Sequence, residues 1–210
     1  YYDLRGYFPF NHYAMSSKKA FSADNQQEKI ETCGWIVGIV DGEGSFLVNV
    51  FKSPRARMGW QVFPEFNVSQ TKKGIDLLYA LRDFFGCGHI YVHTKRNREN
   101  KNWDPLHKYC VRAQKDLRER IIPFFRKYPP RGGAKRRDFE LFVKVVGIIQ
   151  KGEHLNVGGI RKIIKIIEQM THRKPFAQSS AYKFLSSSET IRRGLIAKNK
   201  TRYSPNSMAT

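Results

Sequence analysis

The stretch Trp35-Ile36-Val37-Gly38-Ile39-Val40-Asp41-Gly42-Glu43-Gly44-Ser45-Phe46 decides how this chain folds. Its apolar first half has a helical period, and Gly34 and Gly38 leave one face of that helix without side chains. Two acids set among glycines follow where the helix is expected to end, and a strand-like run begins at once. Two such helices packed side by side would each deliver a carboxylate to the same place. That arrangement suits the binding of a divalent metal ion.

The composition points to a polyanionic partner. The chain has 210 residues, with 38 Lys and Arg against 18 Asp and Glu, a formal charge of +20. Each phosphate that such a surface neutralises releases counterions, which favours binding to nucleic acid. An anionic membrane surface would also attract this charge, but no apolar run approaches the roughly 20 residues that span a bilayer.

Cysteine usage and the N-terminal segment favour an intracellular protein, in a bacterial cytoplasm or an organelle matrix. Cys33, Cys87 and Cys110 are widely spaced and form no C-x-x-C pair, so we expect buried or half-buried thiols. Residues 1–11 are aromatic and polar and lack the apolar core of a signal peptide. Secretion is therefore not expected.

The periodicity of the chain predicts an α+β domain between two tails. We interpret residues 1–24 as an N-terminal extension, 25–172 as the domain and 173–210 as a basic tail with one helix at 190–197. Helical and alternating patterns give the order α-ββα-ββα followed by two extra helices. The expected ranges are a helix from Asn25, strands at 45–52 and 60–70, a helix at 72–85, strands at 89–94 and 108–112, and helices at 115–125, 138–149 and 157–170.

The segment Ile36–Gly44 resembles the LAGLIDADG motif of the homing endonucleases, with Val37 in place of a small Ala and Glu43 in place of the second Asp. The α-ββα-ββα order is similar to the fold of that family, whose curved antiparallel sheet lies in the DNA major groove. Only one copy of the motif is found. The resemblance therefore implies a homodimer with twofold symmetry through the motif helices. Its expected interface residues are Gly34, Trp35, Val37 and Gly38.

The resemblance also implies a site for phosphodiester hydrolysis. Glu43 is expected to bind Mg²⁺, for which Mn²⁺ would substitute, with the carbonyl of Gly42 facing the same ions. Asp41 either contacts metal or braces the helix end. Gln70 matches a strand-end glutamine that orders water near the cleaved phosphate. Lys135 matches a basic residue that acts on the water or on transition-state charge, and the adjacent Arg136 and Arg137 leave the register open by one position.

The resemblance implies that one face of the sheet meets DNA, and because strand side chains alternate, residues two apart on a strand share a face. In the major groove Asn can pair with adenine, Lys and Arg with guanine, and Glu with the amino group of cytosine. Arg55 and Arg57 lie in a loop and are more suited to phosphates. The residues expected on the face toward DNA are Leu47, Asn49, Phe51, Phe63, Glu65, Asn67, Tyr91, His93, Lys95, Lys108, Cys110 and Arg112.

A zinc site is not favoured by the histidines and cysteines of the middle strands. His89 and His93 lie near Cys87 and His107, but the spacing of a metal site is not reproduced. His89 and His93 fit one strand face.

Three functions remain open on these residues. The leading one is a metal-dependent endonuclease, encoded in a group I intron, that cuts a long pseudo-palindromic DNA target as a homodimer. The second is an RNA-binding maturase that assists splicing of its host intron, for which paired metal carboxylates are not needed. The third is a DNA-binding regulator on the same scaffold that does not cleave.

Overall fold

The computed structural model describes residues 23–56, 59–93 and 105–171. The chain divides into two units, residues 1–32 and 33–210, and the boundary falls inside helix α1 (Ala23–Glu43). Within the described ranges no helix is both long and apolar enough to cross a membrane. The second unit holds the sheet and all later helices.

Strands and helices follow in the predicted order α-ββα-ββα, with two further helices. The elements after α1 are β1 (Gly44–Lys52), β2 (Trp60–Gln70), a 3-10 turn (Lys72–Gly74), α2 (Ile75–Phe85), β3 (His89–His93), β4 (Leu106–Val111), α3 (Gln114–Asp116), a π-helical turn (Leu117–Ile121), α4 (Ile122–Lys127), α5 (Gly133–Gln150), a 3-10 turn (Glu153–Leu155) and α6 (Val157–Ile167). The α+β class and the element order are therefore confirmed.

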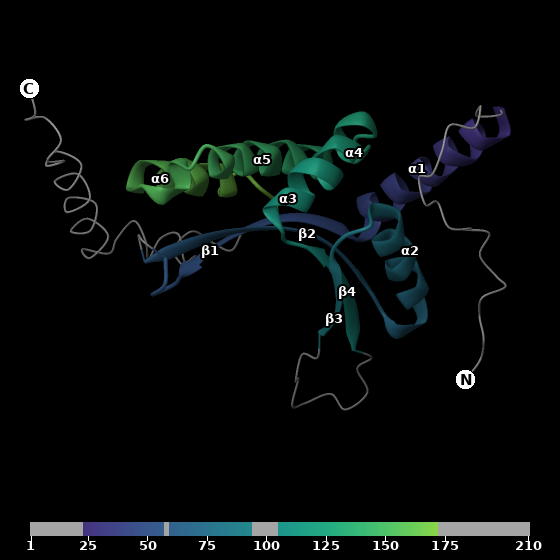
Figure 1. The fold of residues 1–210 in the computed structure, drawn as a ribbon, viewed down its shortest axis with the longest axis horizontal. Helices are drawn as coiled ribbons and strands as arrows, with labels where there is room; N and C mark the ends of the chain where they lie inside the picture. Colours follow the sequence, from purple (N-terminus) through teal and green to yellow (C-terminus); the bar gives the residue numbers. More distant parts are fainter. Residues whose placement is uncertain (1–22, 57–58, 94–104, 172–210) are drawn as a thin grey trace, which may run out of the picture. The chain divides into compact units, whose positions relative to one another are not determined.

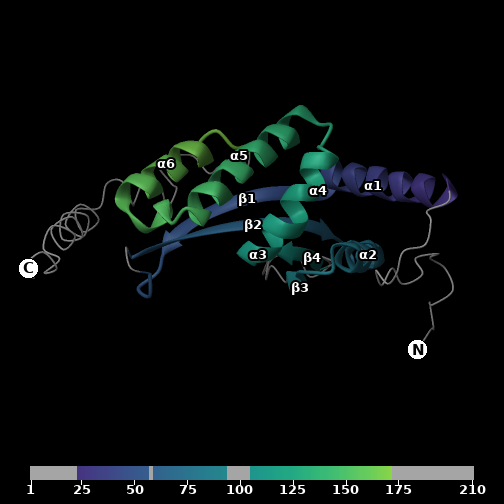
Figure 2. The same cartoon turned by 45° about the horizontal axis from the view of Figure 1, so that its top comes forward.

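The four strands form one antiparallel sheet in the order β1-β2-β4-β3. The sheet is visibly curved, and α4, α5 and α6 lie on one side of β1 and β2 (Figures 1 and 2). Phe46 lies opposite Phe66, which lies opposite Val111, and this row faces the helices. The neighbouring row, with Asn67 opposite Cys110, points to the other face because side chains alternate along a strand.

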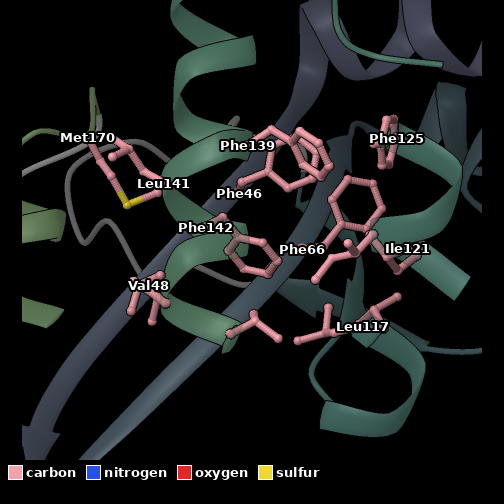
Figure 3. Packing of buried hydrophobic residues seen from close by; sticks show 14 of the residues in the cluster. Phe46, Val48, Phe66, Leu117, Ile121, Phe125, Phe139, Leu141, Phe142 and Met170 are labelled. Carbon is pink, nitrogen blue, oxygen red and sulfur yellow. The ribbon is translucent and has the colours of Figure 1, made fainter. Parts of the chain in front are cut away.

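An aromatic cluster fixes the helices on the sheet (Figure 3). The ring of Phe46 on β1 lies 5.2 Å from that of Phe66, 5.3 Å from Phe125, 5.1 Å from Phe139 and 5.6 Å from Phe142. Since these rings come from β2, α4 and α5, Phe46, two residues after the motif, joins the sheet to two of the helices that cover it. Rings at these separations add to the stabilisation that burial gives.

The start of α5 differs most from the prediction. The periodicity predicts a helix from Asp138, whereas α5 begins at Gly133. Its first turn is exposed and basic, so it lacks the apolar period by which helices are recognised, and the pair Gly132-Gly133 reads as a break. The expected helix at 190–197 lies outside the described residues.

The other boundaries agree within a few residues. Strand β2 has the predicted limits, and Gly86 ends α2 in the left-handed conformation, with φ of 59°. Strand β4 starts two residues before the predicted Lys108, and α6 ends before the predicted Met170. Cys33 and Cys110 are buried free thiols and Cys87 is a half-buried one, as predicted.

Candidate functional site

The candidate site lies where α1 becomes β1, with no loop between them. Glu43 is the last residue of the helix and Gly44 the first of the strand. A Cβ atom on Gly44 would lie 2.8 Å from both the Cα and the carbonyl oxygen of Val40, so only glycine fits this turn. By contrast, a Cβ on Gly42 would meet no atom within 4 Å in the described part of the chain. The acid-bearing end of the helix is thus fixed to the sheet through Gly44.

Asp41 braces this junction against the start of α5. One of its carboxylate oxygens accepts a hydrogen bond from the backbone N–H of Arg131 at 2.9 Å, and the other from that of Gly132 at 3.3 Å. Gly132 is the N-cap residue of α5, where unpaired N–H groups and the helix dipole favour a negative charge. Of the two roles expected for Asp41, bracing is the one seen in this geometry.

Lys135 lies against the same junction. Its half-buried side chain donates a hydrogen bond from Nζ to the carbonyl oxygen of Gly44. The neighbouring Arg136 points elsewhere, since its guanidinium lies 3.6 Å from exposed Glu140 one helical turn along α5. Lys135 therefore contacts the end of the motif and Arg136 does not, which favours Lys135 for the expected role.

Gln70 lies at the same end of the sheet, because β1 pairs with β2 and Gln70 is the last residue of β2. Gly44 lies opposite Val68, so Gln70, two residues later, extends past the start of β1 and pairs with His107 of β4. A Cβ on Gly74 would lie only 2.7 Å from Gln70 Oε1, which places the amide over the first turn before α2. The residue after Glu43, the side chain of Lys135 and the end of β2 that carries Gln70 therefore lie at one end of the sheet, and the catalytic roles expected for these three residues stay predictions.

The described residues of one chain do not form a complete metal site. The Glu43 side chain is exposed and makes no hydrogen bond or ion pair with another described residue. Among the residues that the structure describes, no three His, Cys, Asp or Glu side chains are grouped so as to hold a metal. A free carboxylate next to a glycine carbonyl provides the hard oxygen ligands that Mg²⁺ prefers, but a complete site needs further ligands.

The glycine face of α1 is open. Gly34 and Gly38 are exposed, and a Cβ at either would meet no atom within 4 Å in the described residues. Trp35 is 40% exposed beside them. Val37 does not share this face: it is 6% exposed and lies with Ile36 on the buried side of the helix. The expectation that Val37 contributes to the dimer interface is therefore corrected.

The sheet face opposite the helices carries the side chains expected to meet DNA. Leu47 lies opposite Glu65, Asn49 opposite Phe63, and Tyr91 opposite Lys108, which confirms that these residues share one face. Their exposure varies: Asn49, Phe51, Tyr91 and Arg112 are exposed, Leu47, Phe63 and Lys108 are half-buried, and Glu65, Asn67 and Cys110 are buried. Arg55 is exposed in the turn after β1. Arg57, Lys95 and the side chain of His93 lie outside the described residues.

Glu65 does not offer a free carboxylate, contrary to the expectation. It is 4% exposed, and its Oε1 accepts hydrogen bonds from Lys108 Nζ at 2.9 Å and Asn67 Nδ2 at 2.7 Å. Its Oε2 accepts one from Arg112 Nε at 2.6 Å. Burial raises the pKa of this carboxyl, but the bonds from Lys108 and Arg112 outweigh burial, and the net pKa lies below its ordinary value. Glu65 is consequently an ionised anchor for two cations.

Asn67 and Cys110 are also corrected, because both are buried in the same face. The side-chain amide of Asn67 donates a hydrogen bond to Glu65. Burial raises the pKa of the Cys110 thiol to about 11, so it stays protonated at neutral pH. These two residues support the network and do not present polar groups to a ligand in this conformation.

Neither the partners of Asp41 nor the network around Glu65 could be predicted from the sequence. Arg131 and Gly132 contribute backbone N–H groups that no side-chain motif signals. Asp138 is a further buried acid, 3% exposed, and it accepts the backbone N–H of Thr171 at 2.9 Å. The one local signal for this helix start is the glycine pair before the basic run of α5, since glycine is acceptable as an N-cap residue.

The family model described as LAGLIDADG endonuclease matches residues 36–146. A relative in Neurospora crassa, named probable intron-encoded endonuclease 3, is 33% identical over 153 residues, which are 73% of this chain and 27% of the relative. The chain spans about a quarter of the length of that protein and of two other relatives that it matches.

Solved structures of homing endonucleases have the same fold. The crystal structure of I-TnaI is similar with a TM-score of 0.58 and 33% identity, covering 79% of this chain and 96% of that one. I-SmaMI, bound to its uncleaved DNA target in the presence of calcium ions, is similar with a TM-score of 0.60 and 31% identity, covering 72% of this chain and 48% of that one.

The two acids of the motif should differ in their effect on stability. We expect Asp41→Ala to lower the free energy of unfolding by about 1 kcal/mol or more, because two backbone N–H groups lose their acceptor at a helix start. Glu43→Gln should change it by less than about 0.5 kcal/mol, since exposed side chains without partners contribute little. Urea unfolding followed by circular dichroism at one protein concentration measures both. Equal losses would contradict the assignment of Asp41 as the brace.

The Glu65 network predicts a pH-dependent stability. The pKa of Glu65 is below its ordinary value of 4.5 in the folded chain, so the network stabilises the fold above that pH and the contribution is lost as pH falls through the folded value. Between neutral pH and about pH 3, wild type should therefore lose more unfolding free energy than Glu65→Gln. Parallel pH profiles of the two proteins would refute the ionised anchor.

Proposed function

Because the chain belongs to the LAGLIDADG endonuclease family, we propose that it is a site-specific DNA endonuclease that cleaves both strands of a long, nearly palindromic target with a divalent metal ion. The observation that carries the proposal is the exposed carboxylate of Glu43, which has no partner among the described residues and directly precedes Gly44, the residue that Lys135 contacts. The formal charge of +20 supports a polyanionic substrate.

Glu43 and the carbonyl of Gly42 are the groups of this chain that would hold Mg²⁺. Divalent metal, when bound, lowers the pKa of water and neutralises charge on the phosphate and the leaving oxygen. Lys135 uses one of its three donors on the carbonyl of Gly44 and keeps the others for an incoming phosphate or water. Gln70 adds an amide that can both donate and accept at the same edge.

The second half of the site is supplied by another motif helix, in our proposal from a second copy of the chain. Glycine inside a helix costs about 0.5–1 kcal/mol relative to alanine, and nothing in the described residues requires glycine at Gly34 or Gly38. Close approach of the backbone of a second helix would explain why glycine occupies both positions. Twofold pairing on this face sets two Glu43 carboxylates side by side.

We further propose that the enzyme promotes the mobility of an intron. The support is the name of the Neurospora crassa relative as an intron-encoded endonuclease. An enzyme of this kind would cut the copy of its host gene that lacks the intron, at the insertion point. A long target makes that cut rare elsewhere in a genome.

The direct experiment is cleavage of a supercoiled plasmid that carries the uninterrupted host-gene sequence, in Mg²⁺ and in Ca²⁺. We expect one cut at the insertion point with wild type, and a loss in rate on the order of 100-fold or more with Glu43→Gln. Binding of the same DNA should persist in the variant. Arg126→Gln, on an exposed position of α4, is the control for loss of one charged side chain.

Each other outcome has a clear meaning. Specific binding with no cut in any metal would overturn the nuclease and favour a regulator. Tight binding of intron RNA that is retained by Glu43→Gln, again without cutting, would favour a maturase.

The glycine face gives a test in which monomer stability and association move in opposite directions. Gly38→Gln should raise the free energy of unfolding of the monomer by about 0.5–1 kcal/mol, because Gly is the poorer helix former. The same change should prevent close approach of a second helix and weaken the dimer. Gly147→Gln, at another open helical glycine, is the matched control. Sedimentation and urea unfolding measure the two effects, and an unchanged dimer with Gly38→Gln would refute this interface.

A further inference from the structure

The network around Glu65 holds one arginine in a defined orientation on the sheet face. The guanidinium of Arg112 lies 4.9 Å from the ring centre of Tyr91 on β3 and 5.5 Å from that of Phe63 on β2. Its Nε donates to Glu65 at 2.6 Å. Two rings and one ion pair from neighbouring strands thus restrain a side chain that is 41% exposed. Attraction between a guanidinium and an aromatic ring adds to this restraint.

The restraint leaves the recognition end of Arg112 available. Glu65 engages Nε, so the two terminal amino groups of the guanidinium carry no described hydrogen bond. Those two groups form the fork that matches the O6 and N7 atoms of guanine in the major groove. Lys108, also bound to Glu65, is 28% exposed and less available.

Charge in the network also suits reading a base. One buried carboxylate is shared by two cations, so the cluster keeps a net positive charge while its arginine is held in place. A flexible surface arginine loses rotamer entropy when it binds, and one that is already restrained loses less. That difference favours a group used for sequence discrimination over one used for general phosphate attraction.

We propose that Arg112 reads a guanine in each half of the target and that buried Glu65 is the positioning residue that aims it. This inference rests on the proposed function, since it concerns the DNA that the enzyme binds. It assigns to Glu65 a role that differs from direct contact with a base. Arg112 then determines specificity at one base pair of each half-site.

The test is selection of bound sequences from a randomised duplex library, with the full chain in Ca²⁺, followed by sequencing. Wild type should enrich a target with guanine at one position of each half. In Arg112→Gln the preference for guanine over the other bases at that position should fall by on the order of 10- to 100-fold. Arg112→Lys keeps the charge but loses the fork, so it should lose most of that preference with little change in salt dependence. Arg126→Gln and Arg126→Lys are matched controls, because Arg126 is exposed on α4, which packs on the opposite face of the sheet from Arg112.

Glu65→Gln separates positioning from simple stabilisation. It should relax the preference at the same base pair as the Arg112 variants, while affinity for unrelated DNA stays equal or rises because one negative charge is gone. Thermal unfolding tests whether each variant is folded. If Glu65→Gln is not folded, the exposed Arg112 variants still decide the base assignment, and Glu65→Asp tests the positioning.

The failures are distinguishable. If the wild-type protein enriches no sequence, both the proposed function and this inference are refuted. Enrichment by wild type, with an unchanged guanine preference in both Arg112 variants, overturns only the inference. A uniform loss of affinity with a salt dependence lowered by about one contact in Arg112→Gln would make Arg112 a phosphate contact and would equally overturn it.

Discussion

The passage from α1 to β1 at Glu43 and Gly44, with no loop between them, is the constraint on which the other features depend. The close approach of Gly44 to Val40 lets the helix end and the strand start in consecutive residues. Asp41 then holds the start of α5, and Lys135 of that helix reaches back to Gly44. Because α5 also carries Phe139 and Phe142 against Phe46, the packing of the core and the position of the acid are set by the same joint.

Features encoded locally in the sequence could be predicted. Alternation along β1 and β2 gives both the strand limits and the face to which each side chain points, because that period is a property of the strand itself. The glycines and acids of the motif similarly indicate the helix end. Gln70 and Lys135 could be placed only through the resemblance, since nothing in their immediate surroundings distinguishes them from other polar residues.

Features that depend on distant partners could not be predicted. Asp41 and Gly132 are 91 residues apart, so neither the bracing role nor the early start of α5 is visible in a local window. In the sequence Glu65 is one more polar residue on the face expected to meet DNA, and only the structure shows that Lys108 of β4 and Arg112, just after β4, converge on it. Alternation predicted the correct face there, but it carries no information on which exposed positions become buried by their neighbours across the sheet.

Three carboxylates of this chain show how an acidic group can be used on a basic, DNA-directed scaffold. Asp41 is neutralised by backbone N–H groups and Glu65 by two cations, whereas Glu43 has no partner among the described residues. In the proposed dimer two Glu43 side chains approach each other and a phosphate, and like charges at short distance repel. A bound divalent metal would remove that repulsion, so in this proposal association of the helices, metal binding and DNA binding would favour one another by linkage. In this proposal, the one acid at the joint that lacks a described partner would confine the chemistry to the assembled complex.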